Sequence, residues 1–114
     1  MVSTVPPPAS TRKLSSQLLK DDADLRDIVE EFVNDLNTRL QELCQAHEAL
    51  DWERLSMLAH RLKGASGSYG YPDLSHLAAE MEQSFHIQQA DNFEEWITRF
   101  AELIGAAKNG LSES

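Results

Sequence analysis

Residues 52–70 read WERLSMLAHRLKGASGSYG, and this stretch decides the fold. Its apolar residues recur at steps of three and four, which is the period of one face of an α-helix. At about 100° of rotation per residue, the inward-facing set lies within about 60° of its first leucine. The set comprises Leu55, Leu58, Ala59, Leu62, Ser66 and Tyr69. The pattern predicts an amphipathic helix that packs against other helices, with Asp51 as its N-cap and Gly70 at its end.

Three further long segments show the same helical period. They are residues 22 to about 50, 72–88 and 93–111. Leu50 is the last apolar residue in the stripe of the first of them. Short connections between such helices favour an antiparallel arrangement. The sequence therefore predicts an all-α fold, an antiparallel up-and-down four-helix bundle, with a short extra N-terminal helix beginning near Ser10 or Thr11.

The chain is long enough for one small domain and too short for a catalytic domain plus a regulatory one. Residues 1–10 contain three consecutive prolines, which favour an extended polyproline segment, so we expect a flexible N-terminal tail there. The bundle domain is predicted over residues 11–111, and residues 112–114 form a short C-terminal tail. A complete bundle has no obvious need of a second copy, so we expect a monomer.

Composition and charge exclude several classes of partner. The formal net charge of −9 repels nucleic-acid phosphates and anionic membrane surfaces, so neither is expected as a partner. No apolar run approaches the roughly 20 residues that span a bilayer. The single cysteine, Cys44, cannot form an internal disulfide, and no signal-peptide pattern opens the chain. A cytoplasmic location is therefore expected.

His60 is predicted to face solvent. It lies about 140° around the helix from Leu55, on the opposite side from the leucines. Lys63, Gly64 and Gly67 fall within about 60° of His60 on the same side. A core histidine at this position would require the whole leucine stripe to be misassigned.

The residues around His60 point to a particular chemistry. Each glycine inside a helix costs about 1 kcal/mol relative to alanine, and close approach by another molecule would explain Gly64 and Gly67. A neutral imidazole nitrogen is nucleophilic near pH 7. Lys63, three positions on, would place an ammonium beside incoming phosphoryl oxygens. The pattern predicts a histidine that accepts and returns a phosphoryl group.

At this point the sequence resembles a known family. The stretch HRLKGASGSYG, followed by PDLSHLAAEME, resembles the histidine-containing phosphotransfer (HPt) domain of multistep two-component phosphorelays. The helix layout agrees from about Leu18 to Leu111. The matching positions are His60, Lys63, Gly64, Gly70, Leu74 and Leu77.

The resemblance implies a bundle whose exposed histidine takes a phosphoryl group from a receiver-domain aspartate and passes it to another receiver. His60 would be the phosphoacceptor, Lys63 the charge-stabilising neighbour and Gly64 the source of clearance. The family has no ATP site, and this chain has neither a GxxxxGKS/T loop nor a GxGxxG motif. The domain would be a phosphocarrier rather than an enzyme. Its partners would be response-regulator receiver domains and a hybrid sensor histidine kinase, with Mg²⁺ held by the receiver and no cofactor in this chain.

Two further positions belong to the expected site. In several family members a glutamine on the next helix hydrogen-bonds near the histidine, and the matching position here is Glu82. A carboxylate there could accept the other N–H of the imidazole, but it would also repel a phosphate. Docking needs an exposed, partly apolar rim, for which Met57 is the best candidate on the His60 helix.

Two other functions stay open from the sequence. A metal-binding bundle is suggested by Glu82 and His86, four positions apart on one helix, although di-iron bundles need Glu-x-x-His pairs and none occurs here. A helical adaptor that binds a partner without phosphotransfer is the other alternative. Such an adaptor would not need His60, Lys63 and Gly64 together.

Overall fold

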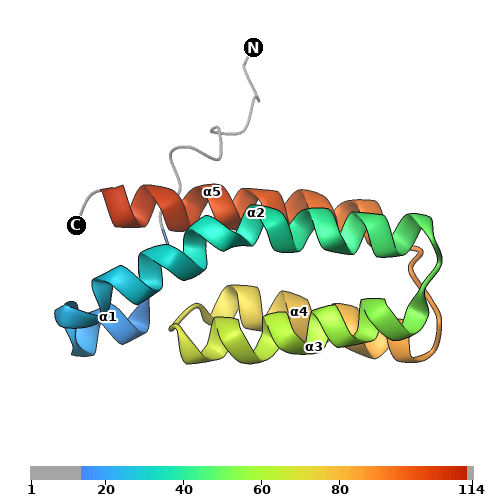
Figure 1. Ribbon diagram of the computed structural model, residues 1–114, viewed down its shortest axis with the longest axis horizontal. Helices are drawn as coiled ribbons and strands as arrows, with labels where there is room; N and C mark the ends of the chain where they lie inside the picture. Colours follow the sequence, from blue (N-terminus) through green and yellow to red (C-terminus); the bar gives the residue numbers. More distant parts are fainter. Residues whose placement is uncertain (1–13, 113–114) are drawn as a thin grey trace, which may run out of the picture.

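The computed structural model describes residues 14–112, and within this range it contains helices and no strand. The elements in chain order are α1 (Gln17–Asp21), the 3₁₀ turn η2 (Ala23–Leu25), α2 (Arg26–Glu48), α3 (Trp52–Ser68), α4 (Pro72–His86) and α5 (Phe93–Ser112). The long helices α2 to α5 run antiparallel to their chain neighbours (Figure 1). The predicted all-α four-helix bundle with a short N-terminal helix is confirmed. The tail predicted at residues 1–10 lies outside the described residues. Of the tail predicted at residues 112–114, Ser112 belongs to α5 instead, and residues 113–114 lie outside the described range.

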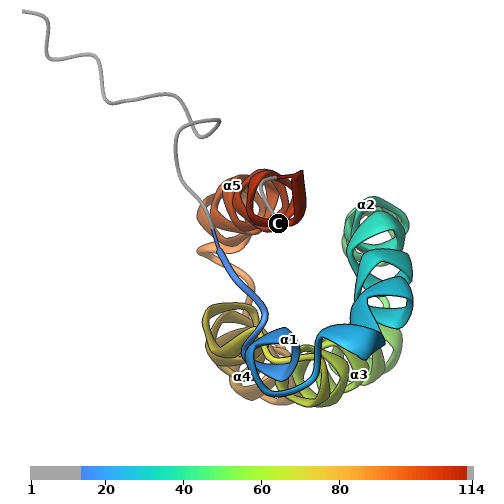
Figure 2. The same ribbon diagram turned by 90° about the vertical axis from the view of Figure 1, so that its left-hand side faces the viewer.

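The long helices form a ring around one core. Helix α2 lies beside α3 and α5, and α4 lies beside α3 and α5, so that α3 and α5 are diagonally opposite (Figure 2). The helix ends follow from local chemistry. The Asp51 carboxylate caps α3 by accepting the N–H of Arg54 (3.1 Å), Pro72 begins α4, and Gly70 follows the end of α3 with φ of +86°. All three of these predictions are confirmed.

The core is built largely from the predicted apolar faces. The inner face of α4 is fully buried and consists of Leu74, Leu77, Ala78, Met81 and Phe85. On α3, Leu55, Ala59, Leu62 and Ser66 are buried, while Leu58 and Tyr69 are half-buried. The prediction for Leu50 is wrong. It lies exposed in the turn after α2, with φ of +51°, because the helix ends at Glu48 and its stripe does not continue.

The helices at the N-terminal end begin later than predicted. Residues 14–16 are not helical, and the N-cap of α1 is Ser16, whose hydroxyl accepts the Leu19 N–H (3.4 Å). Ser10 and Thr11 lie outside the described residues. Residues 23–25 form η2 instead of the first turn of α2. There the Asp22 carboxylate accepts the Asp24 N–H (3.0 Å), a local bond that competes with helix formation.

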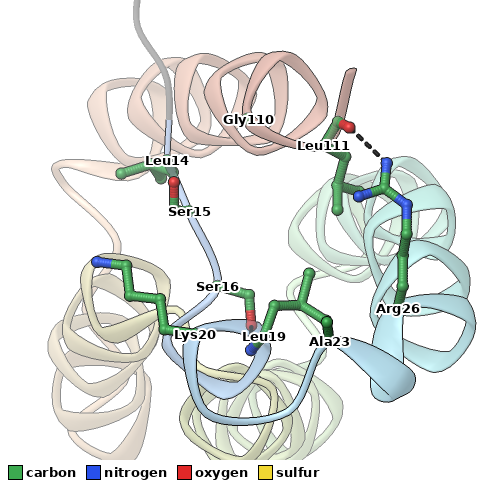
Figure 3. A pocket seen from close by; sticks show the side chains of 9 residues that line it. All are labelled: Leu14, Ser15, Ser16, Leu19, Lys20, Ala23, Arg26, Gly110 and Leu111. Carbon is green, nitrogen blue, oxygen red and sulfur yellow. Dashed lines mark hydrogen bonds between the residues drawn. The ribbon is translucent and has the colours of Figure 1, made fainter. Parts of the chain in front are cut away.

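A front segment, residues 14–21, lies across one end of the bundle (Figure 3). The Leu14 N–H donates to the carbonyl of Ala106 in α5 (2.9 Å), and the Gln17 N–H donates to the carbonyl of Gly70 between α3 and α4 (2.8 Å). These bonds connect the two sides of the bundle end. Beside the segment lies the pocket of about 360 Å³ drawn in Figure 3.

We expect Gly70→Ala to lower the free energy of unfolding by roughly 1–3 kcal/mol, because only glycine fits this conformation and this contact. Its φ is in the left-handed region, and a Cβ at this position would lie 2.6 Å from the Gln17 backbone nitrogen. Urea unfolding followed by circular dichroism measures the change.

Gly105→Ala is the matched control. Gly105 lies inside α5, and an added Cβ would meet none of the described atoms within 4 Å. Alanine should raise the unfolding free energy there by up to about 1 kcal/mol, through helix propensity alone. Equal stability of Gly70→Ala and the wild type would contradict the close approach of the front segment.

Candidate functional site

His60 lies in the middle of α3 on the face that turns away from the core. Its side chain is 67% exposed, whereas Ala59 and Leu62 on the inner face are buried. The helical period that buries the leucines turns His60 outward. The prediction that His60 faces solvent is confirmed.

Glu82 on α4 joins His60 to Lys63. The antiparallel packing of α4 against α3 brings the Glu82 carboxylate to the His60 imidazole, although the two residues are 22 positions apart in the sequence. Oε2 lies 2.9 Å from His60 Nδ1, and Oε1 lies 2.7 Å from Lys63 Nζ. The Glu82 side chain is only 13% exposed. One shielded carboxylate therefore holds the two side chains that the sequence singled out.

This contact fixes the tautomer of the His60 ring. An ionised carboxylate only accepts hydrogen bonds, so Nδ1 of His60 carries the proton that it donates to Glu82. In a neutral imidazole the other nitrogen, Nε2, then has a free lone pair. The arrangement leaves Nε2 as the nucleophilic atom of this ring.

Glu82 is held in its ionised form. The hydrogen bond from Lys63 lowers the pKa of its carboxyl group below the ordinary value of 4.5, and the bond from His60 acts in the same direction. Burial raises the pKa and offsets part of this effect. The carboxylate is thus charged at neutral pH and balances the Lys63 ammonium in the resting protein.

The two glycines beside His60 are not required by the packing of this chain. A Cβ at Gly64 would meet none of the described atoms within 4 Å, and one at Gly67 would make an ordinary 3.6 Å contact with Ser75 Oγ. Alanine would fit at either position. Met57, one turn before His60, is 37% exposed, as expected for a rim residue.

His86 is the residue at this site whose role the sequence did not predict. Its Nε2 lies 3.5 Å from Glu82 Oε2, the oxygen that also accepts from His60. The sequence shows that His86 lies four residues after Glu82, but this spacing suggested only a pair of metal ligands. Within residues 14–112, no group of three or more His, Cys, Asp or Glu side chains is arranged to hold a metal ion.

Comparison with protein families decides the class. The family model of the Hpt domain matches residues 27–110, which is most of the chain. The chain belongs to the Hpt domain family. Comparison with curated proteins and with solved structures gave no match.

Hpt domains carry out histidine phosphotransfer in two-component signalling. They are phosphocarriers that interact with receiver domains and kinases. The matched range of this Hpt domain includes all of α3 and α4, and therefore His60, Lys63 and Glu82. None of the helices in the described part of the chain combines the length and apolarity needed to cross a bilayer.

The lowered pKa of Glu82 predicts an acid-dependent loss of stability. A carboxyl group with a lowered folded-state pKa stabilises the fold fully above its ordinary pKa, and this contribution is lost as pH falls through the folded-state value. The unfolding free energy of the wild type should therefore fall more steeply than that of Glu82→Gln as pH decreases from about 5 to 3. Urea unfolding at a series of pH values measures both slopes.

Glu102→Gln serves as the control, since Glu102 occupies an exposed position on α5. It should keep the wild-type pH dependence. A Glu82→Gln slope equal to that of the wild type would show that the contacts of Glu82 do not stabilise its ionised form.

Proposed function

We propose that His60 accepts a phosphoryl group from the aspartate of one receiver domain and passes it to another, in a multistep two-component phosphorelay. The observation that carries this proposal is the exposed imidazole whose Nδ1 is bonded to Glu82, with Lys63 beside it. A hybrid sensor histidine kinase is the proposed source of the phosphoryl group. The chain acts as a phosphocarrier without an ATP site of its own.

The transfer needs no proton to leave Nε2. Its lone pair attacks the phosphorus of the receiver aspartyl phosphate, the P–N bond forms, and the P–O bond to the aspartate breaks. The aspartate leaves as a carboxylate. The His60 ring, still protonated on Nδ1, becomes a cation, and the adjacent Glu82 carboxylate stabilises that charge. Glu82 thereby favours the phosphorylated ring, although its charge also repels the phosphoryl oxygens.

Lys63 is proposed to stabilise the phosphoryl oxygens. Its ammonium has three N–H donors, and one is directed to Glu82 in the resting protein. The side chain is half-buried but not enclosed, so it can turn toward a group bonded to Nε2 of His60. Gly64 and Gly67 are proposed to let the receiver approach this face. The Mg²⁺ ion that assists the transfer would belong to the receiver domain.

We also propose that the protein works in the cytoplasm as a monomer. Cys44 is a free thiol and the single cysteine of the chain, which fits a reducing compartment. The bundle encloses its own core within residues 14–112.

His60→Gln should abolish phosphorylation, because no nucleophilic nitrogen remains at this position. The measurement offers a phosphorylated receiver domain to the protein and follows acid-labile label on the chain. His76 is another exposed histidine of this bundle, so the variant His76→Gln should be labelled like the wild type. Absence of label on the wild type, or equal label on His60→Gln, would leave a helical adaptor as the better description.

Met57→Glu should slow transfer by about tenfold or more without changing stability, since a carboxylate would enter a contact expected to be partly apolar. Ala101→Glu is the matched control, because Ala101 is exposed on α5, diagonally opposite α3 (Figure 2). Initial transfer rates and thermal unfolding are measured for both variants. Equal rates for Met57→Glu and Ala101→Glu would remove Met57 from the docking surface.

A further inference from the structure

Three nitrogen-bearing side chains converge on the carboxylate of Glu82. Lys63 occupies Oε1, whereas Oε2 lies 2.9 Å from His60 Nδ1 and 3.5 Å from His86 Nε2. Two of these groups come from α3 and belong to the proposed phosphotransfer site. His86 comes from α4 itself, one turn after Glu82, and has no part in the chemistry described so far.

The resting site contains an electrostatic conflict. The charge of Lys63 is balanced by Glu82 at 2.7 Å, yet the same ammonium is needed by the phosphoryl oxygens after transfer. If Lys63 turns toward the phosphoryl group, the shielded Glu82 carboxylate loses its closest cation. The cationic His60 ring stays at Oε2, but Oε1 has lost its partner, and this loss costs free energy for a carboxylate with little access to water. Another cation within reach would remove this penalty.

His86 is placed to supply that cation. Its distance of 3.5 Å from Glu82 Oε2 is within ion-pair range but longer than a good hydrogen bond. The side chain is 61% exposed, so it can move closer without displacing core atoms. Histidine is also the side chain that changes its charge between about pH 5 and 8.

We propose that His86 is a positioning residue that balances Glu82 while Lys63 turns to the phosphoryl group. This inference rests on the proposed function of His60. Protonated His86 adds one positive charge to a site that receives a phosphoryl group with two negative charges. Transfer to His60 is therefore faster when His86 is protonated, and part of the pH dependence of transfer belongs to His86.

The charged groups around His86 come from two helices. Glu82 lies on its own helix, and His60 and Lys63 face it from α3 through that carboxylate. Helix α5 also packs against α4, but its Arg99 pairs with Glu80 (3.8 Å). Glu80 is about 200° around α4 from Glu82, on a different face of the helix. The charges recorded at this site thus come from α3 and α4.

The test measures initial rates of transfer from a receiver domain phosphorylated with acetyl phosphate, at pH values from about 5.5 to 8.5. Each variant rate is divided by the wild-type rate at the same pH, which cancels the pH dependence of the donor. His86→Gln should be about two- to fivefold slower than the wild type at the acid end, the scale of one exposed ion pair, and should approach it at the alkaline end.

His86→Lys carries a permanent charge at the same position. It should match the wild type at the acid end and exceed it by about two- to fivefold at the alkaline end. His76→Gln, which removes another exposed histidine of α4, should give a ratio near one throughout. Thermal unfolding of each variant monitors the fold.

The outcomes separate the inference from the function on which it rests. A His86→Gln ratio that does not change with pH, or a failure of His86→Lys to restore the acid-end rate, overturns the role of His86 while transfer to His60 stands. If the wild type takes no label, or His60→Gln is labelled equally, the proposed function fails and the role of His86 fails with it.

Discussion

The antiparallel packing of α3 against α4 is the contact on which the site depends. Leu55 and Leu62 on α3 and Leu74 and Leu77 on α4 belong to one buried cluster, so the rotation of both helices about their axes is fixed. With the inner faces fixed, the outer faces are fixed as well. The hydrophobic core therefore determines that Glu82 meets His60 and Lys63, although none of these three side chains belongs to that core.

Charge balance at Glu82 links stability to chemistry. The chain carries a net charge of −9, and most of the Asp and Glu residues within 14–112 lie exposed to water. Glu82 is instead shielded, and its closest cation is the ammonium of Lys63. The ion pair that stabilises this carboxylate in the resting protein also keeps the ammonium beside the histidine.

The glycines of this bundle serve different purposes. Gly70 has a positive φ and lies against the backbone of the front segment, so the fold itself requires it. Gly64 faces open space, and the fold would accept alanine there. The proposed approach of a receiver domain to this face would account for a glycine that the packing does not require, next to an exposed histidine. Both residues look alike in the sequence, and only their surroundings distinguish them.

The sequence by itself determined the helices, their inner faces and the outward direction of His60, because a period of 3.6 residues is a local property of the chain. It also brought Lys63 and Gly64 to the side of His60, since all three share one helix. It misplaced Leu50, which follows the end of α2. It also placed the first turns of the N-terminal helices too early, because capping bonds at Ser16 and Asp22 outweighed the periodic pattern there. The nearness of His86 to Glu82 follows from their spacing of four on one helix, and the family resemblance had suggested that Glu82 lies near His60. That one carboxylate joins both His60 and Lys63 was decided only by the tertiary structure, because the lateral fit of two helices depends on packing that no single helix contains.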